Sequence, residues 1–305
     1  MIQDQLASQL GLSKSYLDRL AKSASYRYRE YKIPKKSGGE RVIHHPAREL
    51  KLIQYWLLHN LLQKLPVHVL ATAYRKGSSI KMNADMHTAN NYLLRVDFKD
   101  FFHSLTSVDI SFLLSRNPQI FPAVPENADI DFINRIVSRH GTLTIGAPTS
   151  PLLSNAIMFD FDKEWSERVQ SAQVTYTRYA DDLYFSTNQG NVLQTVLQEL
   201  EEYLKQMKSP RLTINNSKTA FSSRKWRRLA AGLVLTSDRK ISIGRKKKRM
   251  LKAWVNNLKL NRLTPTEVGT LRGWIAYLQA VEPLFVVALQ RKYELDFKSE
   301  STWKL

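Results

Sequence analysis

The sequence predicts an α+β fold, in which an antiparallel sheet and its helices precede a mainly helical C-terminal segment. Two β-rich runs, 174–178 and 183–186, flank Ala180-Asp181-Asp182 and predict a hairpin with acidic residues at its tip. Residues 48–64 predict a helix, because Leu50, Ile53 and Leu57 recur at helical spacing. From residue 239 to residue 266 there are ten basic residues and no acidic one, and this shift in composition marks the C-terminal segment.

Local patterns along the rest of the chain complete the order of elements. They predict a helix over 1–22, a β stretch over 26–44 with a turn at 36–39, a strand over 92–96, a helix from 150, a helix over 192–204, a strand near 212–214 and a hairpin over 232–243. Ser150 can cap its helix and Pro151 suits the first turn. The strand over 92–96 leads directly into Asp97.

Composition favours a polyanionic partner. The chain has 305 residues, and 46 Lys and Arg against 27 Asp and Glu give a formal net charge of +19. Nucleic acid is the commonest partner of such a charge. Charge alone leaves an RNA-packaging protein and a membrane-surface protein open. The absence of cysteine excludes disulfides and Cys-based zinc sites.

No run approaches the roughly 18–20 apolar residues that cross a bilayer. The N-terminal segment is polar and amphipathic, unlike a signal peptide. We therefore expect a cytoplasmic protein with no membrane partner.

Three acidic residues form the candidate catalytic site. A turn between two strands can place Asp181 and Asp182 side by side, and Asp97 also ends a strand. Carboxylates suit Mg²⁺, and a pair of such ions roughly 3.5–4 Å apart can activate an attacking hydroxyl and stabilise a leaving pyrophosphate. Asp is also common in ordinary turns, so the combination of the two sites is far more specific than either alone.

The chain resembles reverse transcriptases, and among them the bacterial retron type. The resemblance runs from about residue 26 to residue 292 in six ordered blocks. These blocks are 31–46, 73–80, Asn83-Ala84-Asp85-Met86-His87, Gly146-Ala147-Pro148-Thr149-Ser150-Pro151, Tyr179-Ala180-Asp181-Asp182 and 212–219. Asn83, Ala84 and His87 fit the retron pattern of Asn-Ala, two variable residues and His.

The resemblance implies a right-hand polymerase. We expect an N-terminal helix and fingers over 1–90, a palm with an antiparallel sheet over 91–238 and a helical, RNA-binding thumb over 239–305. A fingers-side insertion is expected within the palm at about 104–145. The implied reaction is RNA-directed DNA synthesis from deoxynucleoside triphosphates with two Mg²⁺ ions, held by Asp97, Asp181, Asp182 and the Phe98 carbonyl.

The resemblance also implies partners. In retrons the template and primer is a dedicated structured non-coding RNA, and the DNA product stays branched from a guanosine 2′-OH of that RNA. A role in antiphage defence and an accessory effector protein are expected from the same resemblance.

Further residues are assigned roles by type and position. The resemblance places Gly146 beside the incoming nucleotide and Phe102 under its sugar, where an aromatic ring would exclude a 2′-OH. Arg41 and Lys35 can bind the triphosphate, and Lys218 can protonate the leaving pyrophosphate. A buried Phe102 in the core and solvated Arg41, Lys35 and Lys218 are the alternatives.

The basic stretch is the candidate RNA-binding surface. It comprises Arg245, Lys246, Lys247, Lys248, Arg249 and Lys252. Cations that neutralise phosphates provide most of the sequence-independent affinity for nucleic acid.

Two departures from the family pattern stand out. Ile145 precedes Gly146 where the family usually has Gln, and Ala230-Ala231-Gly232 stands where retrons often have Val-Thr-Gly. Two other functions remain open, a group II intron-like or diversity-generating reverse transcriptase and a non-catalytic RNA-binding scaffold. The Asn83–His87 motif favours retrons over the first, and three clustered carboxylates argue against the second.

Overall fold

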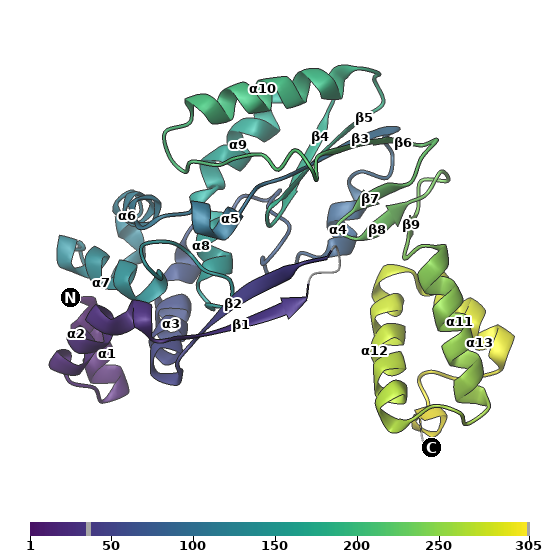
Figure 1. Cartoon of the computed structure of the whole chain (residues 1–305), viewed down its shortest axis with the longest axis horizontal. Helices are drawn as coiled ribbons and strands as arrows, with labels where there is room; N and C mark the ends of the chain where they lie inside the picture. The colour runs from purple at the N-terminus through teal and green to yellow at the C-terminus, as the bar shows by residue number, and fades with distance from the viewer. Residues whose placement is uncertain (35–37, 304–305) are drawn as a thin grey trace.

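A computed structural model describes residues 1–34 and 38–303 of the chain. The elements form three regions along the longest axis, with helices at the N-terminal end, a sheet with helices in the middle and a group of helices at the C-terminal end (Figure 1). The predicted α+β architecture with an antiparallel sheet is confirmed.

Five helices pack together at the N-terminal end. They are α1 (Ile2–Leu10), α2 (Lys14–Ser23), α3 (Arg48–Asn60), α6 (Ser107–Ser115) and α7 (Asn127–Val137). The prediction of one helix over 1–22 was wrong. Gly11 ends α1 in the left-handed region at φ 64°, and the Ser13 hydroxyl accepts a hydrogen bond from Tyr16 N to begin α2.

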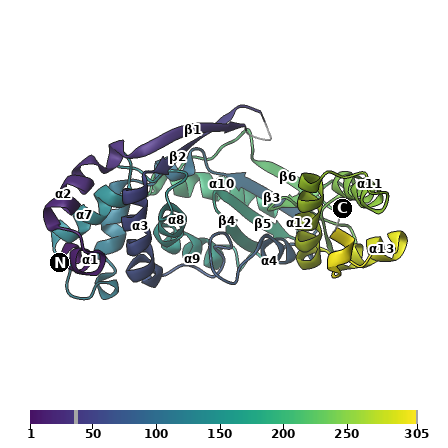
Figure 2. The same ribbon diagram turned by 90° about the horizontal axis from the view of Figure 1, so that it is seen from below.

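A long hairpin of β1 (Tyr28–Pro34) and β2 (Glu40–Pro46) extends from these helices toward the C-terminal region (Figure 2). Its base is bonded to a loop of the central region, where His44 N donates to the Ile145 carbonyl at 2.8 Å. Gly146 follows in that loop at φ 114°, and a Cβ there would lie 2.6 Å from the His44 carbonyl oxygen. A glycine is therefore required for the hairpin to pack this closely.

The central sheet has the strand order β4-β5-β3-β6, with every neighbouring pair antiparallel. Its strands are β3 (Tyr92–Asp97), β4 (Thr175–Tyr179), β5 (Asp182–Thr187) and β6 (Ala220–Ser223). Three helices accompany it, α8 (Ser150–Ile157), α9 (Phe159–Arg168) and α10 (Val192–Gln206). The strand predicted near 212–214 is only a single bridge between Ile214 and Phe98.

Short elements lie within and between these regions. Two are α-helices, α4 (Ile80–Asp85) and α5 (Phe101–Ser104). Others are single 3-10 turns, at Ala24–Tyr26, Leu62–Lys64, Pro118–Ile120 and Glu300–Trp303.

The C-terminal region has its own hydrophobic core. A small sheet precedes three helices, and its strands are β7 (Arg228–Ala230), β8 (Leu233–Leu235) and β9 (Ile241–Ser242). The helices are α11 (Arg245–Lys259), α12 (Pro265–Val281) and α13 (Pro283–Tyr293). Leu235, Leu251 and Leu271 belong to this core, which is distinct from the one beneath the central sheet. The division into three domains at 90 and 239 stays a prediction.

No helix within residues 1–34 and 38–303 combines the length and the apolar character needed to traverse a bilayer.

Candidate active site

The three predicted acidic residues meet at one end of the central sheet. Asp97 at the end of β3 lies directly opposite Asp182 at the start of β5 in the antiparallel register. Asp181 occupies the turn between β4 and β5, and its carbonyl accepts a hydrogen bond from Phe98 N at 3.0 Å. The turn is tight because Ala180 adopts the left-handed conformation at φ 58°.

The carboxylates share a buried, negatively charged environment. Burial raises the pKa of Asp182 to about 6, and the charge of Asp181 adds to the effect. Burial also raises the pKa of Asp181, with a contribution from Asp97, while Lys218 and Arg41 oppose the rise. Desolvated carboxylates that repel one another are stabilised by cations, so this donor set suits a divalent metal ion.

Asp97 is held by cationic and amide donors. Lys218 Nζ lies 2.9 Å from both Asp97 carboxylate oxygens, and Asn215 Nδ2 donates to Oδ1 at 3.1 Å. Within the described part of the chain, no three His, Asp or Glu side chains are gathered in a way that could hold a metal ion. The three carboxylates nevertheless suit a divalent cation by their chemistry and by their common position at one end of the sheet, where Lys218 pairs with Asp97.

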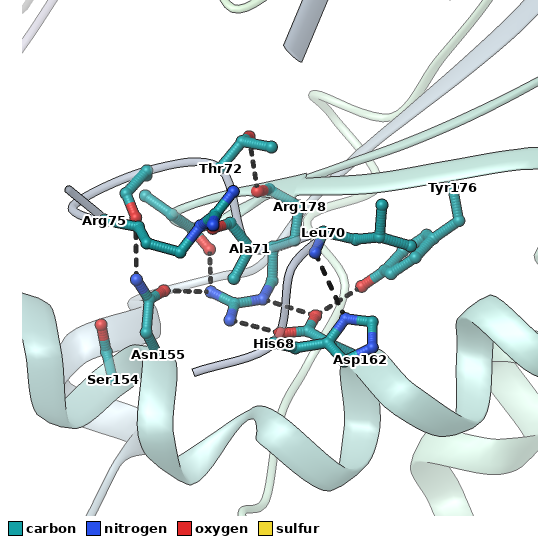
Figure 3. A network of polar contacts seen from close by, with 12 residues as sticks. His68, Leu70, Ala71, Thr72, Arg75, Ser154, Asn155, Asp162, Tyr176 and Arg178 are labelled. Atoms are coloured by element: carbon teal, nitrogen blue, oxygen red, sulfur yellow. Dashed lines mark hydrogen bonds and ion pairs between the residues drawn. The ribbon is translucent and has the colours of Figure 1, made fainter. Parts of the chain in front are cut away.

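A buried ion pair lies directly behind the turn that carries Asp181 and Asp182. Arg178 on β4 and Asp162 on α9 are both fully buried, and Arg178 Nη2 lies 2.6 Å from Asp162 Oδ2 (Figure 3). Arg178 Nη1 donates to the Ala180 carbonyl at 3.0 Å and to Asn155 Oδ1 at 3.1 Å. Tyr176 donates its hydroxyl hydrogen to the same carboxylate at 2.7 Å. This network connects α8 and α9 to the turn that carries Asp181 and Asp182.

Sequence patterns alone do not identify these positioning residues. Arg178 immediately precedes Tyr179-Ala180-Asp181-Asp182, and an arginine inside a β-rich run needs a buried partner, but the sequence does not identify Asp162 as that partner. Burial raises the pKa of Tyr176, and the Asp162 charge adds to it, so the hydroxyl remains a donor.

Tyr184 links Asp182 to one of the departures from the family pattern. Its hydroxyl donates to Asp182 Oδ2 at 3.1 Å and accepts from the Ala231 backbone N–H at 3.0 Å. The contact to position 231 uses only the backbone, so it is available to alanine as well as to other side chains.

The Asn83–His87 motif lies on the same face of the β4–β5 hairpin as Tyr184, opposite the face that carries the Arg178–Asp162 pair. Asn83 Nδ2 donates to Thr177 Oγ1 at 2.8 Å, while the His87 ring bonds Thr177 Oγ1 at 2.8 Å and Ser186 Oγ at 2.7 Å. His87 is fully buried, and burial lowers its pKa to about 3. The motif thus fastens α4 and the turn after it to both strands of the hairpin, a role that residue types alone did not reveal.

Comparison with known proteins identifies the family. Residues 33–248 match the reverse transcriptase (RNA-dependent DNA polymerase) family. The chain belongs to this family. The reverse transcriptase is 36% identical to the retron Ec83 reverse transcriptase of Escherichia coli over 289 residues, which cover 92% of this chain and 93% of that protein. It is 33% identical to the retron Ec73 reverse transcriptase of E. coli, with 88% of each chain covered.

These relatives confirm the predicted resemblance to retron enzymes and the predicted activity of an RNA-directed DNA polymerase. The fold is similar to that of telomerase from Candida tropicalis, solved in complex with a fragment of telomeric RNA. That comparison has a TM-score of 0.50 at 14% identity and covers 93% of this chain and 58% of the telomerase chain. The predicted right-hand polymerase fold is thereby confirmed.

Two of the residues predicted to bind the nucleotide, Arg41 and Phe102, lie near the acids of the reverse transcriptase. Arg41 is exposed near the tip of β2, and its charge lowers the pKa of Asp181. Phe102 is partly buried, with its ring centroid 6.4 Å from that of Tyr74. Burial raises the pKa of Tyr74, and the charge of Asp181 adds to this rise. Phe102 therefore lies beside a residue, Tyr74, that is close to the acids. Lys35 lies outside the described residues.

The predicted RNA-binding residues of α11 fall into two groups. Arg245, Lys246, Arg249 and Lys252 are exposed. Lys248 instead forms an ion pair with Glu282 and lies 4.9 Å from the Phe285 ring centroid, and Lys247 lies over Trp274. Only the first group presents its charges freely to a nucleic acid backbone.

Proposed function

We propose that this reverse transcriptase copies a dedicated structured non-coding RNA into single-stranded DNA and leaves the product attached to that RNA. Priming would use the 2′-OH of a guanosine in the RNA, which produces a branched RNA–DNA hybrid. The observation that carries the chemistry is the pairing of Asp97 with Asp182 beside Asp181 at one end of the sheet. Similarity to retron reverse transcriptases over nearly the whole chain supports the choice of template and product.

Two Mg²⁺ ions are the proposed cofactors, with Asp97, Asp181, Asp182 and the Phe98 carbonyl as their protein ligands. When bound, such ions lower the pKa of the attacking hydroxyl and stabilise the charge on the leaving pyrophosphate. Burial of Asp181 and Asp182 supports this assignment, because each carries a raised pKa that a bound cation would lower.

The surrounding residues orient and select the deoxynucleoside triphosphate. Arg41 and Lys35 are proposed to bind its phosphates, and Gly146 keeps the nucleotide loop close to β2. Phe102 is proposed to lie under the sugar and to exclude a 2′-OH. Lys218, which pairs with Asp97 in the structure, is proposed to give a proton to the leaving pyrophosphate.

In the cell, we propose a cytoplasmic role in antiphage defence together with an accessory effector protein. This part of the proposal is supported by the retron similarity. It predicts that phage resistance requires the reverse transcriptase, its RNA and the effector together, which plaque assays on single deletions of the locus would test.

The nucleic acid that co-purifies with the full chain tests the proposed product. We expect a DNA that shortens on RNase treatment, because RNA is covalently attached, and that disappears on DNase treatment. The variant Asp181→Asn/Asp182→Asn should retain RNA but contain no DNA. Recovery of RNA-linked DNA from this variant, or its absence from the wild type, would overturn the proposal.

A further inference from the structure

Three aromatic side chains are exposed at the end of the central sheet opposite the acids. Trp226 is 77% exposed, Phe221 48% and Tyr92 39%. Phe221 lies on β6 opposite Leu94, and Tyr92 lies two residues before Leu94 on the same face of β3. Exposure of three large rings in one place is unusual for a surface without a partner.

Two of these rings line a groove. Tyr92 and Phe221 line it together with Gln189, Asn191 and Gln194, around a volume of about 250 Å³. Ser223 also lines the groove, and Trp226 N donates to its carbonyl at 2.9 Å, which places the Trp226 turn at the rim. The walls therefore combine aromatic faces with amide side chains that can donate and accept hydrogen bonds, a combination that suits nucleobases.

The rim of the groove is strongly basic. The turn beside it, residues 224–227, carries Arg224, Lys225 and Arg227 and no acid, and the nearby Asp238 pairs with Lys240. Within the described chain, Lys225 and Arg227 form no ion pair with a carboxylate, and both are exposed. Arg224 is anchored beside Tyr92 through a 3.2 Å hydrogen bond from Nη1 to Asn91 Oδ1. A phosphate backbone complements this charge, whereas an acidic or apolar protein segment would match only one half of the surface.

This groove lies away from the polymerase centre. Tyr92 and Asp97 are at opposite ends of β3, about 17 Å apart at roughly 3.3 Å per residue. The groove is also on the face of the sheet that α10 covers, since residues from the start of α10 line it. RNA bound here would be outside the site where the primer end meets the acids.

We propose that the groove between β6 and the start of α10, with the Trp226 turn, is a second nucleic-acid-binding site that captures an unpaired segment of RNA. Bases would stack on Tyr92, Phe221 and Trp226, while Arg224, Lys225 and Arg227 contact the phosphates. The site would hold the template RNA away from the three acidic residues. That the bound RNA is the template rests on the proposed function, whereas the binding of unpaired RNA does not.

Binding of a labelled oligouridylate to the full chain tests this site. A saturating amount of unlabelled RNA–DNA primer–template occupies the polymerase site beside the acids. The fluorescence anisotropy of the labelled oligouridylate then reports binding elsewhere on the protein. We expect the oligomer to bind under these conditions, and the variant Phe221→Ala/Trp226→Ala to bind at least about tenfold more weakly, because stacking contributes about 1–3 kcal/mol per base. A fully paired RNA hairpin should compete poorly, because its bases are not available for stacking.

Phe112→Ala is the matched control, since Phe112 is 57% exposed on α6 and its replacement should leave RNA affinity unchanged. Both variants should keep the wild-type melting temperature and extend a short primer–template normally. Equal affinity of wild type and Phe221→Ala/Trp226→Ala would overturn the proposal, and so would complete displacement of the oligomer by primer–template. Asp181→Asn should still bind the oligomer, so loss of polymerase activity and loss of this site are separable.

Discussion

Arg178 Nη1 donates a hydrogen bond to the carbonyl oxygen of Ala180 at a distance of 3.0 Å. This bond connects the buried Arg178–Asp162 ion pair to the turn that presents Asp181 and Asp182. Ala180 has a left-handed backbone conformation, which an L-residue adopts only when its surroundings hold it there. The ion pair therefore acts as a positioning device for two proposed metal ligands that it does not touch.

Replacing Arg178 alone, and then together with Asp162, should separate the effect of the ion pair on protein stability from its effect on the position of the turn at Ala180. Arg178→Met leaves the Asp162 carboxylate buried and unpaired, so we expect the free energy of unfolding to fall by about 3–5 kcal/mol. In Arg178→Met/Asp162→Leu the uncompensated charge is gone and stability should partly recover. Primer extension should remain impaired in both variants, because the Ala180 carbonyl has lost its donor. Urea unfolding and single-turnover kinetics measure the two effects.

The exposed pair Arg116–Asp160 provides the control for this experiment. Arg116→Met should change the free energy of unfolding by less than about 1 kcal/mol and leave primer extension unaffected. Full polymerase activity in Arg178→Met/Asp162→Leu would show that Arg178 serves stability alone.

Asp182 should reduce stability at neutral pH. Its folded pKa of about 6 lies above the ordinary value of 3.8, so the folded state binds a proton more tightly than the unfolded state. Protonation of this one carboxylate should therefore contribute stability to the metal-free protein as pH falls from about 7 to about 4. Asp182→Asn removes this effect and should raise the free energy of unfolding at pH 7.5 by about 1–3 kcal/mol while abolishing primer extension.

Asp97→Asn is the comparison for this prediction. Asp97 has Lys218 as a counter-charge, so its replacement should bring no comparable gain in stability. Chemical unfolding in the presence of a chelator measures both variants. A loss of stability in Asp182→Asn at pH 7.5 would contradict the proposed mutual repulsion.

His87 should give the opposite pH dependence. Its folded pKa of about 3 lies below the ordinary 6.5, so the unfolded state takes up a proton that the buried ring cannot. Stability should therefore fall as pH decreases from about 6.5 toward 3, by up to about 1.4 kcal/mol per pH unit from this group. His87→Gln should lower stability at pH 8 and flatten this dependence, whereas replacement of the exposed His59 should do neither. An unchanged slope in His87→Gln would rule out a neutral, buried His87.

The exposed cations of α11 should control the salt dependence of RNA binding. Each phosphate contact contributes about 0.7–0.9 to the slope of log affinity against log salt. Arg245→Gln, Lys246→Gln, Arg249→Gln and Lys252→Gln should each flatten the slope by up to that amount. Lys248→Gln should instead lower the melting temperature, because Lys248 pairs with Glu282, whose carboxylate also accepts from Ile243 N. Equal slopes for the wild type and the combined Gln variant would remove α11 from the RNA interface.

Phe102→Ala tests the proposed selection of deoxynucleotides. Removing the ring should raise incorporation of ribonucleotides relative to deoxynucleotides, because a 2′-OH would no longer meet an aromatic face. Primer extension with each nucleotide type measures the ratio, and Phe112→Ala, an exposed phenylalanine on α6, is the control. An unaltered ratio in Phe102→Ala would assign Phe102 to packing alone.

The sequence by itself determined the acids, the hairpin that carries two of them and the family motifs. These features are local, because strand alternation, turn residues and motif spacing are read within a few positions of the chain. It also indicated a basic C-terminal segment, although it could not separate the exposed cations of α11 from Lys248.

Tertiary structure alone decided which distant residues became partners. The Arg178–Asp162 pair, the bonds of His87 to Thr177 and Ser186, and the Lys218 contact to Asp97 each join residues from different elements. Strand register and helix packing select these pairs, and many alternative pairings satisfy the same sequence pattern equally well. The exposed rings of Tyr92, Phe221 and Trp226 came together in the same way, because the pairing of β3 with β6 places them at one end of the sheet.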